Sequence, residues 1–310
     1  MSGRQLKREN RHIPVLLDPV LRAIAPKPGD TIVDCTLGLG GHSAEFLRRI
    51  LPAGKLIALD FDPANIAFAR AKLEAIDPTG ASFALVHNNF AALPTVLANA
   101  GVQRVDGILA DLGVASPQID DPARGFSYRQ PGPLDMRMDP TRGQPASSLI
   151  NKIAEHELRD ALLELGDETD APQIARLIVE RRAIAPIATT DDLMAIVCGA
   201  RDFTLKRAAG AKLHPAARTF QALRILVNRE MANLERLLAV IPDCLKPSRV
   251  AAIISFHSGE DRRVKENFRD GLRGGIYEDI SRDAITASEM EQRENPRSRS
   301  AKLRWAKLSS

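Results

Sequence analysis

Apolar residues in this chain fall into short runs that alternate with longer segments of helical periodicity. Runs of strand type occupy residues 31–36, 56–60, 82–87, 107–111 and 250–256. Between the first four runs, helical spacing is seen in residues 43–51, 64–76 and 90–100, the last interrupted by Pro94. Strands that alternate with helices in this way predict an α/β fold with a parallel, doubly wound sheet.

The alternation stops after about residue 116. A loop rich in Pro, Gly, Asp and Arg follows, and the chain then keeps helical periodicity without a strand-like run to about residue 197. We read this part as a helical domain inserted into the sheet domain, where it would serve substrate recognition. The expected segments are 1–116 and 216–310 for the two parts of the sheet domain, and 117–215 for the insertion.

Beyond the insertion, apolar positions from Phe220 to Leu238 recur with helical spacing. They predict one long amphipathic helix that ends before Pro242, because proline disrupts a helix interior. The run at 250–256 then returns to the sheet, and residues 300–305 predict a final strand.

Composition narrows the class of protein. A chain of 310 residues with 44% hydrophobic content can bury a large core and is long enough for about two domains. The chain has no run of about 18 apolar residues, so we expect a soluble, cytoplasmic protein with no membrane partner. Cys35, Cys198 and Cys244 are widely separated and form no C-x-x-C pair, which predicts reduced, buried thiols and no metal site.

The net charge of +4 is unevenly distributed. One basic cluster contains Arg201, Lys206, Arg207, Lys212, Arg218, Arg224 and Arg229, with Asp202 as the only acid between Arg201 and Arg229. A second, in the tail, contains Arg293, Arg297, Arg299, Lys302, Arg304 and Lys307. Such clusters provide phosphate contacts in nucleic-acid-binding proteins, whereas a single cluster is commonly a solvated helix face.

A glycine loop follows the first strand-like run. It reads Asp34-Cys-Thr-Leu-Gly38-Leu-Gly40-Gly41-His42-Ser43, and Asp60 ends the next run. Glycines let the backbone come close to a ligand, and the following helix start offers unpaired N–H groups. A carboxylate after the second strand can accept ribose hydroxyls, so the pattern predicts an adenosine-containing cofactor. The alternative is a tight strand-to-helix turn without a ligand.

The loop also indicates which cofactor binds. The dinucleotide fingerprint G-x-G-x-x-G requires a third glycine where this chain has Ser43. An acid four residues before the first glycine, as Asp34 is to Gly38, instead resembles class I (Rossmann-like) methyltransferases. In these enzymes the acid can meet the positive end of S-adenosylmethionine.

A second constellation follows the fourth strand-like run, from Asp111 through Ser116-Pro117 to Gln118. It resembles the polar-Pro-Pro-aromatic signature of amino-methyltransferases, in which side-chain and backbone acceptors hold the target NH₂. Such acceptors matter because an exocyclic amine delocalises its lone pair and attacks poorly. Gln118 replaces the aromatic residue, so the base would stack on Tyr128, Phe126 or Phe256; the alternative is an ordinary turn.

Cysteine placement favours transfer to nitrogen or oxygen. Methylation of pyrimidine carbon 5 uses a nucleophilic thiol, commonly in a Pro-Cys step, and no cysteine here follows a proline. The chemistry we expect requires neither a metal nor a covalent intermediate.

Several longer motifs span nearly the whole chain. They are His12-Ile-Pro-Val-Leu-Leu-Asp18, Thr36-Leu-Gly-Leu-Gly-Gly-His-Ser43, Asp111-Leu-Gly-Val-Ala-Ser-Pro-Gln118, Arg124-Gly-Phe-Ser127, Gly132-Pro-Leu-Asp-Met-Arg-Met-Asp-Pro140, His214-Pro-Ala-Ala-Arg-Thr-Phe-Gln-Ala-Leu-Arg224, Ile254-Ser-Phe-His-Ser258 and Asn295-Pro-Arg-Ser-Arg299. Together they resemble the bacterial ribosomal RNA small-subunit methyltransferase H family.

That resemblance implies N4-methylation of one cytidine in the decoding region of small-subunit ribosomal RNA. It further implies S-adenosylmethionine contacts from Gly40, Gly41, His42, Asp60, Phe90, Asp111 and Gln118. Asp111 and Ser116 would hold the amine. The sequence leaves open whether two copies form a homodimer.

The expected substrate residues each have a second reading. Asp135 and Arg137 bind RNA or brace their loop through an ion pair. His257 orients the target base or completes a strand end. Arg218 and Arg224, about two helical turns apart, fit phosphate contacts.

Three functions therefore compete: a ribosomal RNA methyltransferase, a noncatalytic RNA-binding assembly factor of the same fold, and a small-molecule methyltransferase. The assembly factor has no need of Asp60, and the small-molecule enzyme leaves the basic clusters unexplained.

Overall fold

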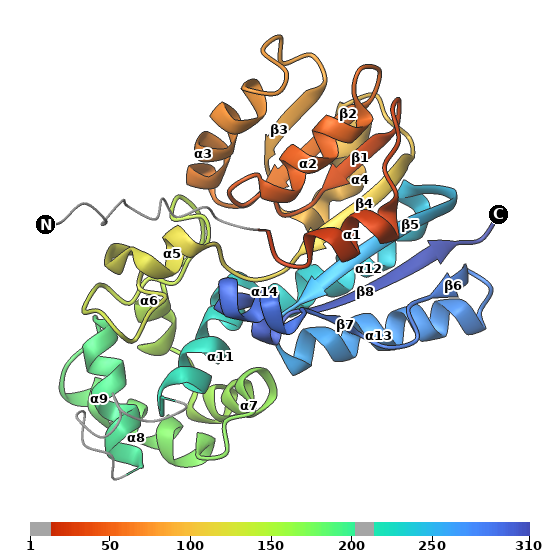
Figure 1. Ribbon diagram of the computed structural model, residues 1–310. Helices are drawn as coiled ribbons and strands as arrows, with labels where there is room; N and C mark the ends of the chain where they lie inside the picture. Colours follow the sequence, from red (N-terminus) through yellow and green to blue (C-terminus); the bar gives the residue numbers. More distant parts are fainter. Residues whose placement is uncertain (1–13, 202–213) are drawn as a thin grey trace, which may run out of the picture. The chain divides into compact units, whose positions relative to one another are not determined.

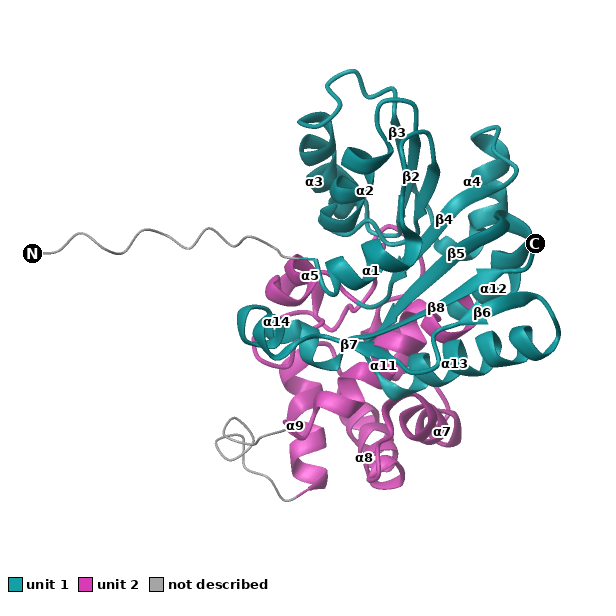
Figure 2. Cartoon of the chain, turned by 45° about the vertical axis from the view of Figure 1, so that its right-hand side comes forward, with its two compact units in different colours: residues 1–113, 234–310 teal, residues 114–233 magenta. Residues whose placement is uncertain are grey.

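The chain divides into two units, and the computed structural model describes residues 14–201 and 214–310 of them. Residues 1–113 and 234–310 form the unit that we call the sheet unit, and residues 114–233 form the helical unit (Figure 2).

One sheet forms the centre of the sheet unit, in the strand order β3-β2-β1-β4-β5-β8-β6 (Figure 1). Its strands are β1 (Thr31–Asp34), β2 (Lys55–Asp60), β3 (Phe83–His87), β4 (Val105–Asp111), β5 (Leu245–Ser255), β6 (Tyr277–Ile280), β7 (Ile285–Thr286) and β8 (Lys302–Leu308). Neighbouring strands among β1 to β5 are parallel, whereas β8 pairs antiparallel with β5, β6 and β7. The predicted doubly wound α/β fold is thus confirmed, and its order reverses between β1 and β4, where open α/β sheets bind ligands.

Each face of this sheet has its own core. On one face, Ile32 of β1 joins a cluster with residues of α1 (Leu17–Ile24), α2 (Gly41–Ile50) and α3 (Pro63–Glu74). On the other, Val33 joins residues of α4 (Leu93–Asn99), α12 (Glu230–Cys244) and α13 (Ser258–Arg273). This is the period of two that a strand buried on both sides requires. The shorter elements η1 (Phe90–Ala92), α14 (Glu289–Glu294) and η3 (Pro296–Ser300) complete the unit.

The helical unit has a separate core. Its elements are α5 (Ser116–Asp120), η2 (Pro122–Arg124), α6 (Ala146–Ile150), α7 (Glu155–Gly166), α8 (Ala171–Ile184), α9 (Thr190–Ala200) and α11 (Ala217–Asn228). Leu162 of α7, Ile178 of α8 and Phe220 of α11 share one buried cluster. Within this unit, the only strand-type pairing that the described residues make is the bridge between Pro133 and Thr189.

The boundaries of this unit differ from the expected 117–215. The unit extends to residue 233 because α11 packs its apolar face, including Phe220 and Leu223, into the helical core. The predicted long helix is also two helices, since Arg229 adopts a left-handed conformation (φ 50°) that ends α11. The second of them, α12, includes Pro242 in its last turn, so the expected end before Pro242 is wrong by a few residues.

Two other sequence expectations bear on the described chain. The thiols of Cys35, Cys198 and Cys244 are free and buried, as predicted. In residues 14–201 and 214–310, no helix combines the length and the apolar content that a membrane crossing needs.

Phe220 tests the assignment of α11 to the helical core, because only 3% of its surface is exposed. We expect Phe220→Ala to lower the free energy of unfolding by about 3–5 kcal/mol, through lost burial and an unfilled cavity. Phe68→Ala is the control, since Phe68 is 57% exposed and its loss should cost less than about 0.5 kcal/mol. Urea unfolding of the two variants should separate them, and equal losses would contradict the packing described.

Candidate functional site

The glycine loop connects the carboxyl end of β1 to α2, and its conformation depends on its glycines. Gly38 (φ 50°) and Gly40 (φ 70°) adopt the left-handed conformation, with Gly40 at the N-cap of α2. A Cβ on Gly41 would lie 2.5 Å from Cγ of Pro14. The loop therefore has tight geometry, which both a cofactor-binding loop and a turn without a ligand require. The contacts of the neighbouring side chains must decide between these two interpretations.

Asp34, at the end of β1, holds the loop together. Its Oδ1 accepts a hydrogen bond from the backbone N–H of Thr36 (3.1 Å), and its Oδ2 accepts one from Oγ of Ser43 (2.7 Å). Burial raises the pKa of Asp34 to about 6. Ser43, which stands where a dinucleotide fingerprint has glycine, thus supplies a bond that glycine cannot make. Asp34 therefore braces the loop, and its contact with the cofactor stays a prediction.

Asp60 connects the same loop to β2. Its Oδ2 accepts from the backbone N–H of Gly38 (2.7 Å), and its Oδ1 accepts from the N–H of Asp62 (2.8 Å) and from Nδ2 of Asn65 (3.2 Å). Burial raises its pKa to about 6. An ionised carboxylate oxygen accepts about two hydrogen bonds, so Oδ2 keeps capacity for one ligand hydroxyl.

Asp111 ends β4 next to the loop. Its backbone N–H donates to Oγ1 of Thr36 (2.6 Å), and its Oδ2 lies 3.7 Å from Nδ1 of His42, whose Nε2 lies 3.0 Å from the carbonyl of Val15. The other oxygen, Oδ1, is buried and has no hydrogen-bond partner among the described residues. Burial, and then the nearby charge of Asp34, raise the pKa of Asp111 well above its usual range.

Glu260 adds a fourth carboxyl group, from the first turn of α13. Only 2% of its surface is exposed. Its Oε2 accepts from the backbone N–H of Phe256 (2.8 Å), and its Oε1 lies 3.3 Å from Nε2 of His257. Its charge also contributes to the raised pKa of Asp111.

The carboxyl edge of the sheet is therefore acidic and poorly neutralised. In the described part of the chain, no Lys or Arg forms an ion pair with Asp34, Asp60 or Asp111, although burial opposes the ionisation of all three. Buried carboxylates are costly unless a cation or donors stabilise them. This arrangement fits a ligand that brings positive charge and hydroxyl donors.

The remaining cofactor candidates lie on other elements. Phe90 begins η1 after β3 and packs half-buried against the sheet core. Gln118 belongs to the helical unit, is buried, and accepts from the backbone N–H of Ala115 (2.7 Å) at the start of α5. Ser116 is the half-buried first residue of α5.

Two substrate candidates have structural partners. Arg224 forms a bidentate ion pair with Glu230, both bonds 2.8 Å long, and its side chain is only 18% exposed. The ring of Tyr128 stacks on His214 with centroids 4.3 Å apart. Arg224 thus has a structural partner, and its contact with phosphate stays a prediction. One face of the Tyr128 ring is already covered by His214.

The other substrate candidates differ in whether their side chains already have bonding partners. Asp135 and Arg137 form a bidentate pair (2.7 and 2.8 Å), as the second reading of that loop expected. Although burial acts to raise the pKa of Asp135, Arg137 lowers it overall. His257 caps α13 beside Glu260 and is 11% exposed. Arg218 is half-buried and forms no ion pair among the described residues.

The basic clusters are largely used within the fold. In the first, Arg201 pairs with Glu168 and Asp170, while Lys206, Arg207 and Lys212 lie outside the described residues. In the tail, acids pair with Arg293, Lys302, Arg304 and Lys307. Among the described residues, some cations of both clusters are therefore used in ion pairs, and phosphate binding by the remaining ones stays a prediction.

Three residues of the site were missed in the sequence: Thr36, Ser43 and Glu260. Ser43 was noted as a missing glycine and as the end of a motif, but not as a partner of Asp34. Glu260 carried a signal, because it stands three residues after the helix N-cap His257, the spacing of a capping box. Thr36 carried none, since its partner is a backbone N–H 75 residues away.

The chain is similar to proteins of one family over nearly its whole length. A family model described as the MraW methylase family matches residues 9–309. Ribosomal RNA small subunit methyltransferase H of Nitratidesulfovibrio vulgaris is 44% identical, over 95% of this chain and 85% of that protein. The protein of that name from Acidobacterium capsulatum is 42% identical, over 97% and 99%. A solved rRNA methylase structure from Streptococcus thermophilus matches 95% of this chain and 94% of that chain with a TM-score of 0.42 and 9% identity, too weak a likeness to bear on function.

The raised pKa of Asp34 predicts a stability cost at high pH. A carboxyl whose pKa is higher in the folded state stabilises the fold when protonated, and this contribution is lost as the pH rises through about 6. Asp34→Asn can keep both hydrogen bonds, because the hydroxyl of Ser43 can accept as well as donate. Urea unfolding gives the free energy of unfolding of the variant and of the unmodified protein. The difference between them, variant minus unmodified, should be about 1.4 kcal/mol more positive at pH 8 than at pH 5.

Asp106→Asn is the matched control. Although burial acts to raise the pKa of Asp106, its bonds to Lys246 and to the backbone of Thr31 lower it overall. Asp106 is therefore ionised throughout this pH range. Asp106→Asn should lower the free energy of unfolding by the same amount at pH 5 and at pH 8. A pH-independent effect of Asp34→Asn would contradict the account of Asp34.

Proposed function

Since the chain belongs to the MraW methylase family, we propose that it methylates small-subunit ribosomal RNA with S-adenosylmethionine as methyl donor. Family membership agrees with the motifs in the sequence. We propose further that the target is N4 of a cytidine in the decoding region. Its partner would be the small ribosomal subunit, in the cytoplasm.

The observation that carries the proposal is the acidic edge, where no Lys or Arg of the described residues pairs with Asp34, Asp60 or Asp111. S-adenosylmethionine has a positive sulfonium, an ammonium group and a ribose diol. Asp60 has capacity for one ribose hydroxyl, and the Gly38–Gly41 loop offers backbone N–H groups at the start of α2. Asp111 offers a buried oxygen with no partner among the described residues. These residues fit the cofactor, which supplies an electrophilic methyl group when bound.

We propose that Asp111 performs the chemistry required from the protein. Its Oδ1 would accept a hydrogen bond from the cytosine amine, which favours the pyramidal, nucleophilic form of the nitrogen. As the nitrogen gains positive charge, the same carboxylate would take the leaving proton, and a raised pKa suits this task. Ser116 is a proposed second acceptor, on the strength of its position in the motif.

Asp111→Asn tests this role. The amide keeps the size and one acceptor but cannot take a proton, so kcat should fall by about 100-fold or more. Folding should be retained, because the variant removes a buried carboxylate that is costly to ionise. The measurement is methyl transfer to unmethylated small subunits with nucleoside mass spectrometry; kcat within threefold of the unmodified protein would contradict the role.

Asp60→Asn provides the comparison within the same site. It should weaken S-adenosylmethionine binding about tenfold or more in calorimetry and leave kcat at saturating cofactor much less affected. Tight binding of subunits by the unmodified protein, without methyl transfer or cofactor binding, would favour the noncatalytic assembly factor.

A further inference from the structure

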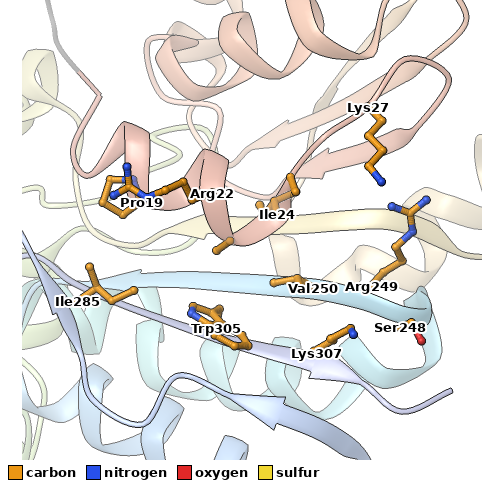
Figure 3. Close-up of a pocket in the computed structure, with 12 residues that line it drawn as sticks. Pro19, Arg22, Ile24, Lys27, Ser248, Arg249, Val250, Ile285, Trp305 and Lys307 are labelled. Atoms are coloured by element: carbon orange, nitrogen blue, oxygen red, sulfur yellow. The ribbon is translucent and has the colours of Figure 1, made fainter.

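A groove in the sheet unit is lined by none of the acidic-edge residues Asp34, Asp60, Asp111 and Glu260. It has a volume of about 490 Å³ and is lined by α1, the loop after it, the start of β5, and residues of β7 and β8 (Figure 3). Its apolar part includes Val250, Ile285 and Trp305, and its basic part includes Arg22, Lys27 and Lys307. None of the described residues that line it is acidic.

The groove exists because α1 leaves part of the sheet open. Helix α1 packs over β4 and β5 through Val20 and Ile24. Along β8, Leu303 is buried on this face, whereas Trp305 is only half-buried and Lys307 is half-exposed beyond it. A half-buried tryptophan at the margin of a core is well placed to stack with a ligand.

The charges of the lining are not equally available. Arg249 pairs with Asp30 (3.1 Å) and Asp106 (2.9 Å), and Lys307 pairs with Glu278 (2.6 Å). Arg22 and Lys27 are exposed, and neither side chain forms an ion pair with a described residue. Two free cations therefore lie at the rim of an apolar groove that contains an aromatic ring.

We propose that this groove binds a single-stranded nucleotide of the same RNA that carries the methylated base. The base would stack on Trp305, and the adjoining phosphates would contact Arg22 and Lys27. Aromatic stacking combined with cations is how proteins hold single strands without reading their sequence. The volume is within the range of small-molecule sites, which are about 300–1,000 Å³. The proposal rests on the proposed function, since it gives the RNA substrate a second contact.

The chain provides its own probe, because Trp305 is its only tryptophan. Hexauridylate has no exocyclic amine and cannot act as methyl acceptor. Titrated at low salt, it should change Trp305 fluorescence in a saturable way. Arg22→Gln with Lys27→Gln should weaken binding about tenfold and reduce the slope of log K against log salt by about 1.4.

The matched control is Arg70→Gln with Arg273→Gln, which removes the same charge from exposed positions on α3 and α13 outside the groove. It should leave both affinity and fluorescence change nearly unaltered. Equal losses in the two double variants, or no saturable fluorescence change, would overturn the proposal. Uridine monophosphate that binds as tightly as hexauridylate would also overturn it, because the groove would then recognise a free nucleotide.

Methyl-transfer kinetics separate this proposal from the proposed function. With the groove variant, KM for small subunits should rise about tenfold, while kcat and S-adenosylmethionine affinity stay unchanged. Unchanged KM would contradict a substrate contact even if hexauridylate binds. If the unmodified protein transfers no methyl group yet Trp305 responds to hexauridylate, the proposed function fails and RNA binding by the groove stands.

Discussion

The structure depends on carboxyl groups buried at the carboxyl edge of the parallel strands. Asp34 and Asp60 both bond to the glycine loop, and Thr36 of that loop accepts from the backbone of Asp111. The ends of β1, β2 and β4 are thereby connected through one short segment. Each buried carboxylate of pKa about 6 costs about 3 kcal/mol to ionise, relative to its usual environment. Ionisation of such groups at neutral pH lowers the free energy of unfolding of the unliganded protein. A cationic ligand that binds to them can raise it again.

The same topology explains how one sheet unit can provide two different surfaces. The parallel strands end at the acidic edge, where the strand order reverses and α2 begins. The antiparallel strand β8 extends the sheet next to β5, and α1 leaves Trp305 of β8 only half-buried. Acidic residues with raised pKa values therefore characterise the first surface, and basic and aromatic residues characterise the second.

The sequence predicted the local features of the fold well. Short apolar runs located the five strands β1 to β5, and the glycine loop with Asp60 located the acidic edge, because these signals lie within a few residues of one another. The break at Arg229 was missed, since an apolar stripe continues through it and only the left-handed backbone ends α11. The stripe also could not show that α11 packs into the helical core.

Charge partners could not be read from the sequence. Arg224 looked like a phosphate contact, but folding brings Glu230 to its guanidinium. In the tail cluster, Arg304 likewise has an acidic partner, because folding brings it to Asp261, 43 residues earlier in the chain. Conversely, Arg22 and Lys27 belong to no obvious cluster and are free among the described residues. Ion pairs depend on the tertiary structure, so a count of charges along the sequence could not separate the paired cations from the free ones.

The central claim is that the acidic edge holds S-adenosylmethionine for transfer to a cytosine amine. Its most direct test is incubation of the protein with labelled S-adenosylmethionine and unmethylated small ribosomal subunits, followed by mass spectrometry of the nucleosides. The account predicts one labelled product, N4-methylcytidine. Label in a different nucleoside, or no label despite bound cofactor, would contradict it.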